Sequence, residues 1–409
     1  MRIVHSGASG GQGSCAEYDW RDWAAKDRMK SLRVCFVVES GTDVRLVEGL
    51  AGLSNLTVLA RKIERGVEIS HRPSVSVPIV VGPSSRLGFA GLVLRYLWQQ
   101  RRRTDLVMVQ GYSVAALAAN LASRRTGTQT LMLVCSPTEA YYRCRRTHPV
   151  PDKPFRRHEL LGLQLLARVN ASMGDQYIVI SQYLADVVRS HGTRRPVHII
   201  PIYGVDTRIF RLPEEPKAAI RARLSLPTRG LLVFFSSRIA PEKDSLTFLL
   251  AMRRLLRDGR DLWVLHRSGG YRALVEEAVR VGIADRVIAT DAVHPHQRLP
   301  LDYQASDLCV QASREEGLGF SPLEALACGV PVIAAAVGGL KETIVDGQTG
   351  WTYRVGDVEA LAGCIADALD SPAEAAKRVA AGRNLVCARY DRQVVFEQLS
   401  RAIGLAEAA

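Results

Sequence analysis

Two glutamates flank a glycine-rich turn in the stretch REEGLGFSPLEALACGVPV, and their spacing suggests that they bind a polar ligand together. Glu316 and Glu324 are separated by seven residues. Ser321 followed by Pro322, with Glu324 three positions after the serine, predicts a helix that begins with a capping box. The glycines would let backbone N–H groups point at phosphate or sugar oxygens near the positive end of that helix. In the alternative interpretation, Glu324 only caps the helix and Glu316 faces solvent.

A second polar segment, VFFSSRIAPEK at residues 233–243, continues from an apolar run. It places Arg238 and Lys243 just beyond the end of an expected strand. Two cations there would neutralise a diphosphate, whose leaving oxygen gains negative charge when the bond to it breaks. Cations are common on protein surfaces, so this pair indicates a diphosphate site only in combination with the two glutamates.

Short apolar runs alternate with longer helical patterns along most of the chain. The runs are continuous, which is typical of parallel strands covered on both faces. Their alternation with helices predicts βαβ units, open parallel sheets and an α/β fold. We expect strands at 33–38, 56–60, 105–109, 130–135, 177–181, 197–201, 231–236, 262–266, 286–289, 307–310 and 331–336. We expect helices at 43–52, 112–125, 159–173, 182–190, 243–257, 272–282 and 357–370.

A turn-rich stretch at 203–216 interrupts this alternation and precedes a new strand–helix series. Such a break predicts a domain junction. We therefore expect two doubly wound domains in tandem. Ligands of such sheets bind beyond the carboxyl ends of the strands, which here means the cleft between the domains.

The composition is ordinary for a soluble globular protein but strongly basic. The chain has 409 residues, of which 47% are hydrophobic and 23% charged, and its net charge is +13. This balance suggests nucleic acid, an anionic membrane face or a phosphorylated small molecule as partner. None of the eight cysteines has C-x-x-C spacing, so we expect reduced thiols in a cytosolic protein. No run approaches the roughly 18 apolar residues of a membrane span, and residues 1–28 lack the apolar core of a signal peptide.

Together these segments resemble the retaining glycosyltransferases of family 4, the glycosyl transferases group 1, which have the GT-B fold. SSRIAPEK at 236–243 resembles the family's GR(L/I)xxxKG motif, and EEGLGFSPLEALACGVPVIA at 315–334 resembles its pair of glutamates. GGLKETIVDGQTGW at 338–351 is similar to the loop that follows, and YGVDTRIF at 203–210 to the NGVDxxxF linker. The resemblance covers residues 30–400 in order and spacing.

The resemblance implies two Rossmann-like, doubly wound domains that face each other across a deep cleft. It predicts an N-terminal acceptor-side domain, a C-terminal domain that binds the nucleotide sugar, and a final helix that packs back on the N-terminal domain. The residues before the first strand are expected to form a disordered leader. The predicted boundaries are 1–30 for the leader, 31–204 and 205–387 for the domains, and 388–409 for the final helix.

The resemblance also implies roles for single residues. Arg238 and Lys243 would contact the donor diphosphate, Glu324 the ribose hydroxyls and Glu316 the transferred sugar. Arg238, Lys243 and Glu316 are thus the candidate catalytic residues. Backbone amides near the sugar and phosphates would come from Gly317, Leu318, Gly319, Phe320, Gly338 and Gly339. Family members need neither an obligatory metal nor a cofactor, and the chain has no clear Asp-x-Asp metal motif.

Several positions depart from the family pattern. Asp244 replaces the final glycine of the KG motif, and Tyr203 replaces the asparagine of the linker. The run HRSGGYRAL at 266–274 only approximates the glycine motif expected on the donor side. Because of these departures, the sequence does not determine which residues contact the base and the diphosphate.

The N-terminal half matches the family less closely. Gly41 and Thr42 follow the first strand and are candidates to line the acceptor side of the cleft. The alternative is an ordinary turn in which Thr42 or Asp43 caps a helix. Glu139 stands near a position where the family often carries a histidine, and it is a third candidate for the acceptor side.

Two basic segments lie in the N-terminal half. Residues 143–158 carry six Arg or Lys against one Asp, and residues 86–103 combine apolar side chains with a terminal arginine cluster. Such segments can lie on an anionic membrane face or can be core-facing helices with a solvated end. No nucleic-acid motif occurs, and the charges are not interleaved with stacking aromatics, so nucleic acid is not expected as a partner.

We therefore predict a cytoplasmic enzyme, peripheral to the inner membrane face if the basic segments bind it. It would move a sugar, with retention and without metal, from a nucleotide-diphosphate sugar to a glycan or lipid-linked acceptor of cell-surface polysaccharide or glycolipid biosynthesis. Two alternatives stay open. A sugar-nucleotide epimerase is disfavoured by the paired glutamates, and a non-catalytic sugar-nucleotide-binding protein would bind without turnover.

Overall fold

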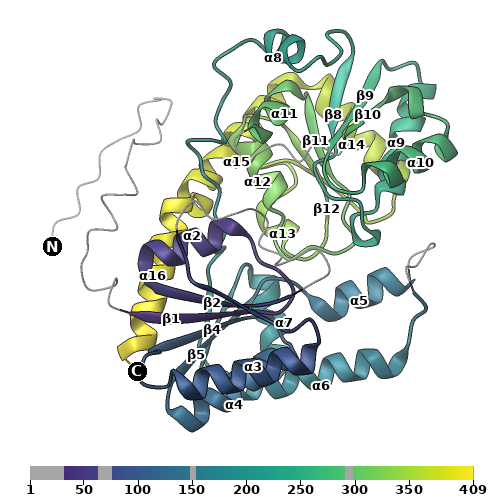
Figure 1. Cartoon of the computed structure of the whole chain (residues 1–409). Coiled ribbons are helices and arrows are strands. Elements are labelled where there is room, and N and C mark those ends of the chain that lie inside the picture. The colour runs from purple at the N-terminus through teal and green to yellow at the C-terminus, as the bar shows by residue number, and fades with distance from the viewer. Residues whose placement is uncertain (1–31, 63–75, 148–152, 291–297, 409) are drawn as a thin grey trace.

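The computed structural model describes residues 32–62, 76–147, 153–290 and 298–408, which form two parallel β-sheets covered by helices (Figure 1). The predicted leader at 1–30 lies outside the described residues.

The first sheet has seven strands in the order β3-β2-β1-β4-β5-β6-β7, and all neighbouring pairs are parallel. Its strands are β1 (Arg33–Val38), β2 (Asn55–Arg61), β3 (Ile79–Gly82), β4 (Leu106–Gln110), β5 (Gln129–Val134), β6 (Gln176–Val179) and β7 (Val197–Ile199). Its helices are α2 (Val44–Leu53), α3 (Arg86–Gln99), α4 (Val114–Thr126), α5 (Thr138–Thr147), α6 (Arg157–Met173) and α7 (Gln182–Ser190). Four of these helices begin at a side chain that accepts a hydrogen bond from a first-turn N–H, namely Asp43, Ser85, Ser113 and Ser181.

The second sheet has six parallel strands in the order β10-β9-β8-β11-β12-β13. Its strands are β8 (Leu231–Phe234), β9 (Leu262–Arg267), β10 (Val287–Thr290), β11 (Leu308–Gln311), β12 (Val332–Ala335) and β13 (Trp351–Tyr353). The α-helices that follow β7 are α8 (Lys217–Arg223), α9 (Ser245–Arg257), α10 (Tyr271–Val281), α11 (Leu299–Ala305), α12 (Phe320–Ala327), α13 (Leu340–Thr343), α14 (Val358–Asp370), α15 (Pro372–Leu385) and α16 (Arg392–Ala408). Shorter turns are η2 (Pro241–Lys243), η3 (Ala284–Arg286) and η4 (Val386–Tyr390).

The strands predicted from apolar runs are all present, with ends within two residues of the expected ones. Strands β3 and β13 were not predicted. Both lie at the edge of a sheet and are short, and Ile79 and Val81 of β3 are exposed. The three residues of β13 include Thr352 and so form no apolar run, whereas β3 (IVVG) is an apolar run that the prediction overlooked.

The chain crosses between the two sheets twice. It leaves the first sheet after β7 and returns between η4 and α16, where Val205 forms an isolated bridge with Asp391. The Phe396 ring of α16 fills the space that a side chain at Gly49 would need, and Arg392 pairs with Glu48 at 3.8 Å. Helix α16 therefore lies beside α2 of the first domain (Figure 1).

Asp244, which replaces a glycine of the family pattern, has a left-handed backbone with φ 50° and ψ 53°. This region is strained for residues with a Cβ, although aspartate tolerates it better than most. The Asp244 carboxylate accepts a hydrogen bond from the Thr247 hydroxyl at 2.9 Å and pairs with Arg314 at 2.9 Å. The side chain thus caps α9, which offsets the strain.

Replacing Asp244 with alanine should lower the free energy of unfolding by about 2 kcal/mol, because the cap is lost while the left-handed backbone remains strained. Asp244→Gly loses the same contacts but relieves the strain, so it should be more stable than Asp244→Ala by roughly 1 kcal/mol. Chemical denaturation followed by circular dichroism measures both variants. Equal stability of the two would contradict the strain argument.

Candidate active site

Loops at the carboxyl ends of both sheets meet around Gly317, which follows β11. The Ser181 hydroxyl, at the start of α7, donates a hydrogen bond to the Gly317 carbonyl at 2.6 Å. A Cβ at Gly317 would lie 2.9 Å from the carbonyl oxygen of Cys135, which follows β5. The carboxylate of Glu342 accepts hydrogen bonds from the first two amides of α7 at 2.9 and 2.8 Å, at the positive end of that helix. The two domains are therefore in direct contact at the predicted donor loop.

Gly338 and Gly339 pack on the backbone of the same loop. A Cβ at Gly338 would overlap the carbonyl oxygen of Glu316, and one at Gly339 would overlap that of Gly317. The Gly339 N–H donates to the Glu316 carbonyl at 3.0 Å. These glycines shape the loop, and the Gly339 amide is already engaged inside it.

The predicted capping box at Ser321 is wrong. Helix α12 begins at Phe320, its N-cap is Gly319 at φ 90°, and no side chain accepts a hydrogen bond at its start. The buried Glu324 carboxylate instead meets groups from elsewhere in the chain. Tyr303 donates its hydroxyl to Oε2 at 3.1 Å, and Arg45 donates to Oε1 at 3.3 Å. The interpretation of Glu324 as a helix cap is therefore excluded.

Arg45 is a residue of the site that the sequence analysis missed. It belongs to the first turn of α2 and reaches Glu324 across the domain boundary, over a separation of 279 positions. Its guanidinium pairs with Asp43 at 2.7 Å and lies 5.9 Å from the ring centroids of both Tyr203 and Phe320. Burial raises the pKa of Glu324, and the positive charge of Arg45 lowers it in part. No local pattern in the sequence signals this contact.

Gly41 and Thr42 lie in the loop that leads from β1 to Arg45. Gly41 has a φ of 94°, and Thr42 is buried. Asp43, rather than Thr42, caps α2, because its carboxylate accepts a hydrogen bond from the Arg45 N–H at 2.8 Å. The turn is thus also a helix start, and it brings Arg45 to the site.

Glu316 and Lys243 lie in direct contact. Lys243 ends η2, after β8, and its ammonium group pairs with Glu316 Oε2. The Gln311 amide and the Ser313 hydroxyl donate to the same oxygen, each at 3.1 Å. Glu316 is 9% exposed, so the interpretation of a solvated loop residue is excluded.

Arg238 lies at the rim of this cluster, with 57% of its side chain exposed, and pairs with Glu242 at 2.8 Å. The fully buried Glu242 carboxylate also accepts two hydrogen bonds, at 2.8 and 2.6 Å, from Arg145 of α5 in the first domain. Burial raises the pKa of Glu242, but the hydrogen bond from Arg145 and the charges of Arg145 and Arg238 lower it more, so the net shift is downward. Arg145, part of the predicted basic segment, is thus a contact between domains.

His266, expected near the donor, is a buried side chain of the second domain. Its Nδ1 lies 2.8 Å from the Phe235 carbonyl oxygen, and burial lowers its pKa. The Gly269 carbonyl accepts a hydrogen bond from the Ile239 N–H at 3.0 Å. The run from His266 to Gly270 therefore contacts the loop that carries Arg238.

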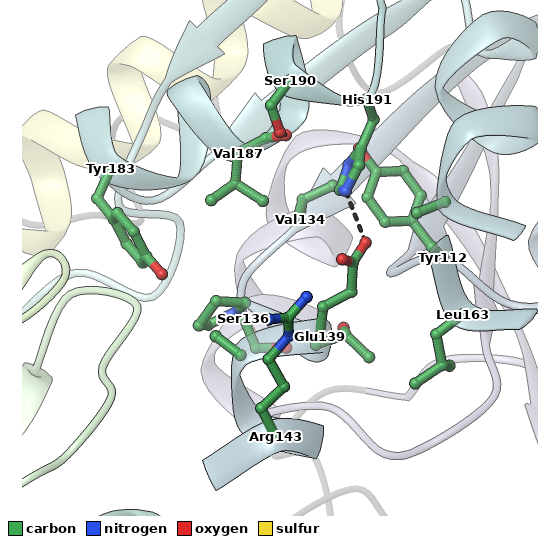
Figure 2. A pocket seen from close by; sticks show the side chains of 14 residues that line it. Tyr112, Val134, Ser136, Glu139, Arg143, Leu163, Tyr183, Val187, Ser190 and His191 are labelled. Carbon is green, nitrogen blue, oxygen red and sulfur yellow. Dashed lines mark hydrogen bonds and ion pairs between the residues drawn. The ribbon is translucent and has the colours of Figure 1, made fainter. Parts of the chain in front are cut away.

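Glu139 lies apart from the Lys243–Glu316 cluster. It lines a cavity of the first domain and is 2.8 Å from Nε2 of His191, a residue that the sequence analysis did not single out (Figure 2). In the described part of the chain, no group of three or more His, Cys, Asp or Glu could hold a metal ion. The seven cysteines that the structure describes are free thiols.

The sequence of residues 216–385 matches the family model described as glycosyl transferases group 1. The 2-deoxystreptamine N-acetyl-D-glucosaminyltransferase of Streptomyces fradiae is 30% identical over 359 residues, which are 82% of this chain and 83% of that protein. The chain belongs to the glycosyl transferases group 1 family. The predicted family and the predicted enzyme class, a glycosyltransferase, are confirmed.

This glycosyltransferase is also 34% identical to the GDP-mannose-dependent alpha-(1-6)-phosphatidylinositol monomannoside mannosyltransferase of Mycolicibacterium smegmatis, over 46% of this chain and 50% of the relative. The chain spans about half the length of that curated relative.

Two solved structures are similar over most of the glycosyltransferase. Sucrose-phosphate synthase from Thermosynechococcus elongatus has a TM-score of 0.75 at 21% identity, covering 92% of this chain and 100% of that chain. Anabaena HepE in complex with UDP and glucose has a TM-score of 0.71 at 17% identity, covering 91% and 100%. These likenesses show the fold, and the predicted GT-B architecture of two Rossmann-like domains is confirmed.

Because of the contacts of Glu242, the free energy of unfolding should depend on pH in the acidic range. Because its folded-state pKa lies below the ordinary value of 4.5, Glu242 stabilises the folded protein above that pH, and this contribution is lost as the pH falls through the folded-state pKa. We expect the free energy of unfolding to fall more steeply between about pH 5 and pH 3 in the wild type than in Glu242→Gln. Chemical denaturation at a series of pH values measures the slopes.

The matched control is Glu276→Gln, which changes an exposed carboxyl of α10. It should keep the slope of the wild type. If the wild type and Glu242→Gln lose stability in parallel, the contribution assigned to the Glu242 contacts is contradicted.

Proposed function

We propose that this glycosyltransferase is retaining and metal-independent and moves a sugar from a nucleotide-diphosphate donor to a glycan or lipid-linked acceptor. The observation that supports this best is the direct contact of Lys243 and Glu316 beyond the carboxyl ends of β8 and β11, with Arg238 in the same loop as Lys243. A cation for the phosphates and a carboxylate for the sugar hydroxyls are thus held side by side.

When the donor binds, Lys243 and Glu316 would each replace their contact with the other by a contact with the donor. Lys243 would turn to the diphosphate, and Glu316, held by Gln311 and Ser313, would accept hydrogen bonds from the sugar. Arg238, which is more than half exposed, can reach the same phosphates. These cations and the N-terminal amides of α12 provide the positive charge that a divalent ion provides in other transferases.

Retention follows if the acceptor attacks from the face that the phosphate leaves. The bond between the sugar C1 and the phosphate oxygen breaks, and a bond from C1 to the acceptor oxygen forms. The acceptor proton passes to the departing phosphate, whose charge Lys243 and Arg238 stabilise. This route needs no side-chain nucleophile.

Glu324 is proposed to bind the ribose. Its carboxylate is buried, faces the domain boundary and has a long contact of 3.3 Å with Arg45, which a diol can replace. Arg45 would remain nearby, and its positive charge lowers the pKa of Glu324 and so favours the ionised form, against the effect of burial.

One face of the first domain is proposed to contact an anionic membrane at the cytoplasmic side. Helices α3, α4 and α6 lie side by side there (Figure 1). Leu87, Leu94 and Trp98 of α3 are exposed on one helix face, as are Leu161 and Leu165 of α6. Exposed arginines flank these residues at positions 95, 101, 102, 103, 124, 125, 157 and 168. No helix in the described part of the chain has the length and hydropathy needed to span a bilayer.

Glu324→Ala should weaken donor binding by about 1–3 kcal/mol, because the ribose hydroxyls and Arg45 lose their buried acceptor. Calorimetry with UDP- and GDP-linked sugars, with and without EDTA, measures the affinity and identifies the base. Glu276→Ala, at an exposed carboxylate of α10, is the matched control and should bind like the wild type. An unchanged affinity of Glu324→Ala would refute its role, and binding that EDTA abolishes would refute metal independence.

The double variant Leu94→Ser and Trp98→Ser should sediment several-fold less than the wild type with vesicles of phosphatidylglycerol and phosphatidylcholine, because apolar contact with the bilayer is lost. Added salt should also reduce the bound fraction of the wild type. Val279→Ser, at an exposed apolar residue of α10 in the second domain, is the control. A wild type that stays in the supernatant would show that this face does not bind membranes.

A further inference from the structure

A groove of about 660 Å³ lies on the second domain, where the last turns of α9 and α10 meet the amino ends of β9 and β10. The donor-side residues Arg238 and Lys243 follow β8 at the opposite, carboxyl edge of the same sheet. Strand β9 has six residues, and at about 3.3 Å per residue it separates the two edges by roughly 20 Å. The groove is therefore separate from the proposed donor site.

Arginines dominate the charged lining of this groove. Arg286 is engaged, because it bonds to Asp261 at 2.6 Å, and Arg260 is engaged by Asp370 at 2.8 Å. Two further arginines of α9 lack such a partner. The charged residues that line the groove are Arg253, Arg257, Arg260, Arg286, Asp261 and Asp285.

Arg253 and Arg257 are the two arginines whose charge is not compensated. In the part of the chain that the structure describes, no carboxylate lies within 4.0 Å of either guanidinium. They stand one helical turn apart, a spacing at which like charges destabilise a helix. Arg254, between them in sequence, shows the usual arrangement, since it pairs with Asp258 at 2.5 Å and with Glu359 at 3.4 Å. The groove thus keeps two positive charges side by side at a cost to the helix.

The alternative interpretation is that these arginines only complete the carboxyl end of α9. A backbone amide already does so, because the Gly259 N–H donates to the Leu256 carbonyl at 3.1 Å. Within the described ranges, neither uncompensated guanidinium donates a hydrogen bond to a carbonyl. The helix dipole favours a cation at Arg257 in the last turn, but its effect does not extend to Arg253 in the turn before. Capping therefore does not explain the pair.

We propose that this groove is a second anion site and that it binds a diphosphate between Arg253 and Arg257. A guanidinium binds phosphate oxygens through paired N–H groups, and two arginines about 5–6 Å apart at their Cβ atoms suit two linked phosphates. The volume of about 660 Å³ lies in the range of roughly 300–1,000 Å³ typical of small-molecule sites. The diphosphate can be inorganic pyrophosphate or part of a nucleoside diphosphate, since both present the same group.

A second hollow adjoins the groove and distinguishes these two sources. It shares Asp261, Asp285 and Arg286 with the groove and extends to the half-buried Trp263. The Arg286 guanidinium lies 5.0 Å from the centre of a Trp263 ring. A nucleoside attached to the diphosphate would extend into this hollow, whereas pyrophosphate would occupy the arginine end alone. Trp263 should therefore affect the binding of a nucleotide but not of pyrophosphate.

Calorimetry of the full chain with inorganic pyrophosphate and inorganic phosphate tests the proposal. We expect pyrophosphate to bind at least ten-fold more tightly than phosphate. The double variant Arg253→Gln and Arg257→Gln should weaken pyrophosphate binding in the groove at least ten-fold. The matched control, Arg125→Gln and Arg168→Gln, removes the same charge at exposed positions of α4 and α6 and should bind like the wild type.

Diphosphates would also bind beside Lys243 under the proposed function, so the two sites are told apart by variants. Lys243→Met, or Arg238→Met if the former fails to fold, should keep the binding that the groove variant loses. Arg257→Glu, at an exposed position, replaces the double variant if that one fails to fold. Pyrophosphate binding that survives in the groove variant but disappears in Lys243→Met would overturn the groove site and leave the donor site intact.

The remaining outcomes are equally decisive. A wild type that binds no pyrophosphate, or binds phosphate equally well, would refute the diphosphate site, as would equal weakening in the matched control. UDP and GDP then identify the source. If either binds the groove more tightly than pyrophosphate and Trp263→Ala removes the gain, the ligand is a nucleoside diphosphate. Pyrophosphate binding that is as tight or tighter assigns the groove to the free diphosphate.

Discussion

The close approach of the Gly317 backbone to the Cys135 carbonyl is the contact on which the arrangement of the site depends. Any side chain at Gly317 would enter the first domain, since even a Cβ would lie 2.9 Å from that oxygen. The absence of a side chain allows a loop of the second sheet to rest on the first. That loop carries Glu316 and leads into α12, so the contact fixes where Glu316 and Glu324 stand relative to the first domain.

Carboxylates of the second domain form most of the polar contacts across the boundary. Glu324 meets Arg45, Glu242 meets Arg145, and Glu342 binds the first amides of α7. A buried carboxylate without a partner would be costly, so these contacts stabilise the buried charges of Glu324 and Glu242, whereas Glu342 is only half-buried. Two of these carboxylates also belong to the donor-side clusters. Under the proposed function, donor binding and domain contact involve the same groups.

The two halves of the enzyme differ in how closely they follow the family. The matched family region, 216–385, lies in the second domain, where Lys243, Glu316 and Glu324 stand. A departure there, Asp244, is accommodated by a helix cap that compensates for a strained backbone. The cavity with Glu139 and His191 lies wholly in the first domain, outside that region. The family model therefore matches the domain that carries Lys243 and Glu316 but not the domain that carries this cavity.

The sequence by itself determined the strand–helix alternation, the two parallel sheets and the family, because apolar runs and motif spacings are local properties of the chain. It also indicated Lys243, Glu316 and Glu324, which belong to such motifs. It gave a wrong helix start at Ser321, because the cap depends on where the Glu324 carboxylate points. Only the tertiary structure decided that Arg45 meets Glu324 and that His191 meets Glu139. These pairs join loops at sheet ends that are distant in sequence, and their contact follows from the packing of sheets and helices rather than from any local pattern.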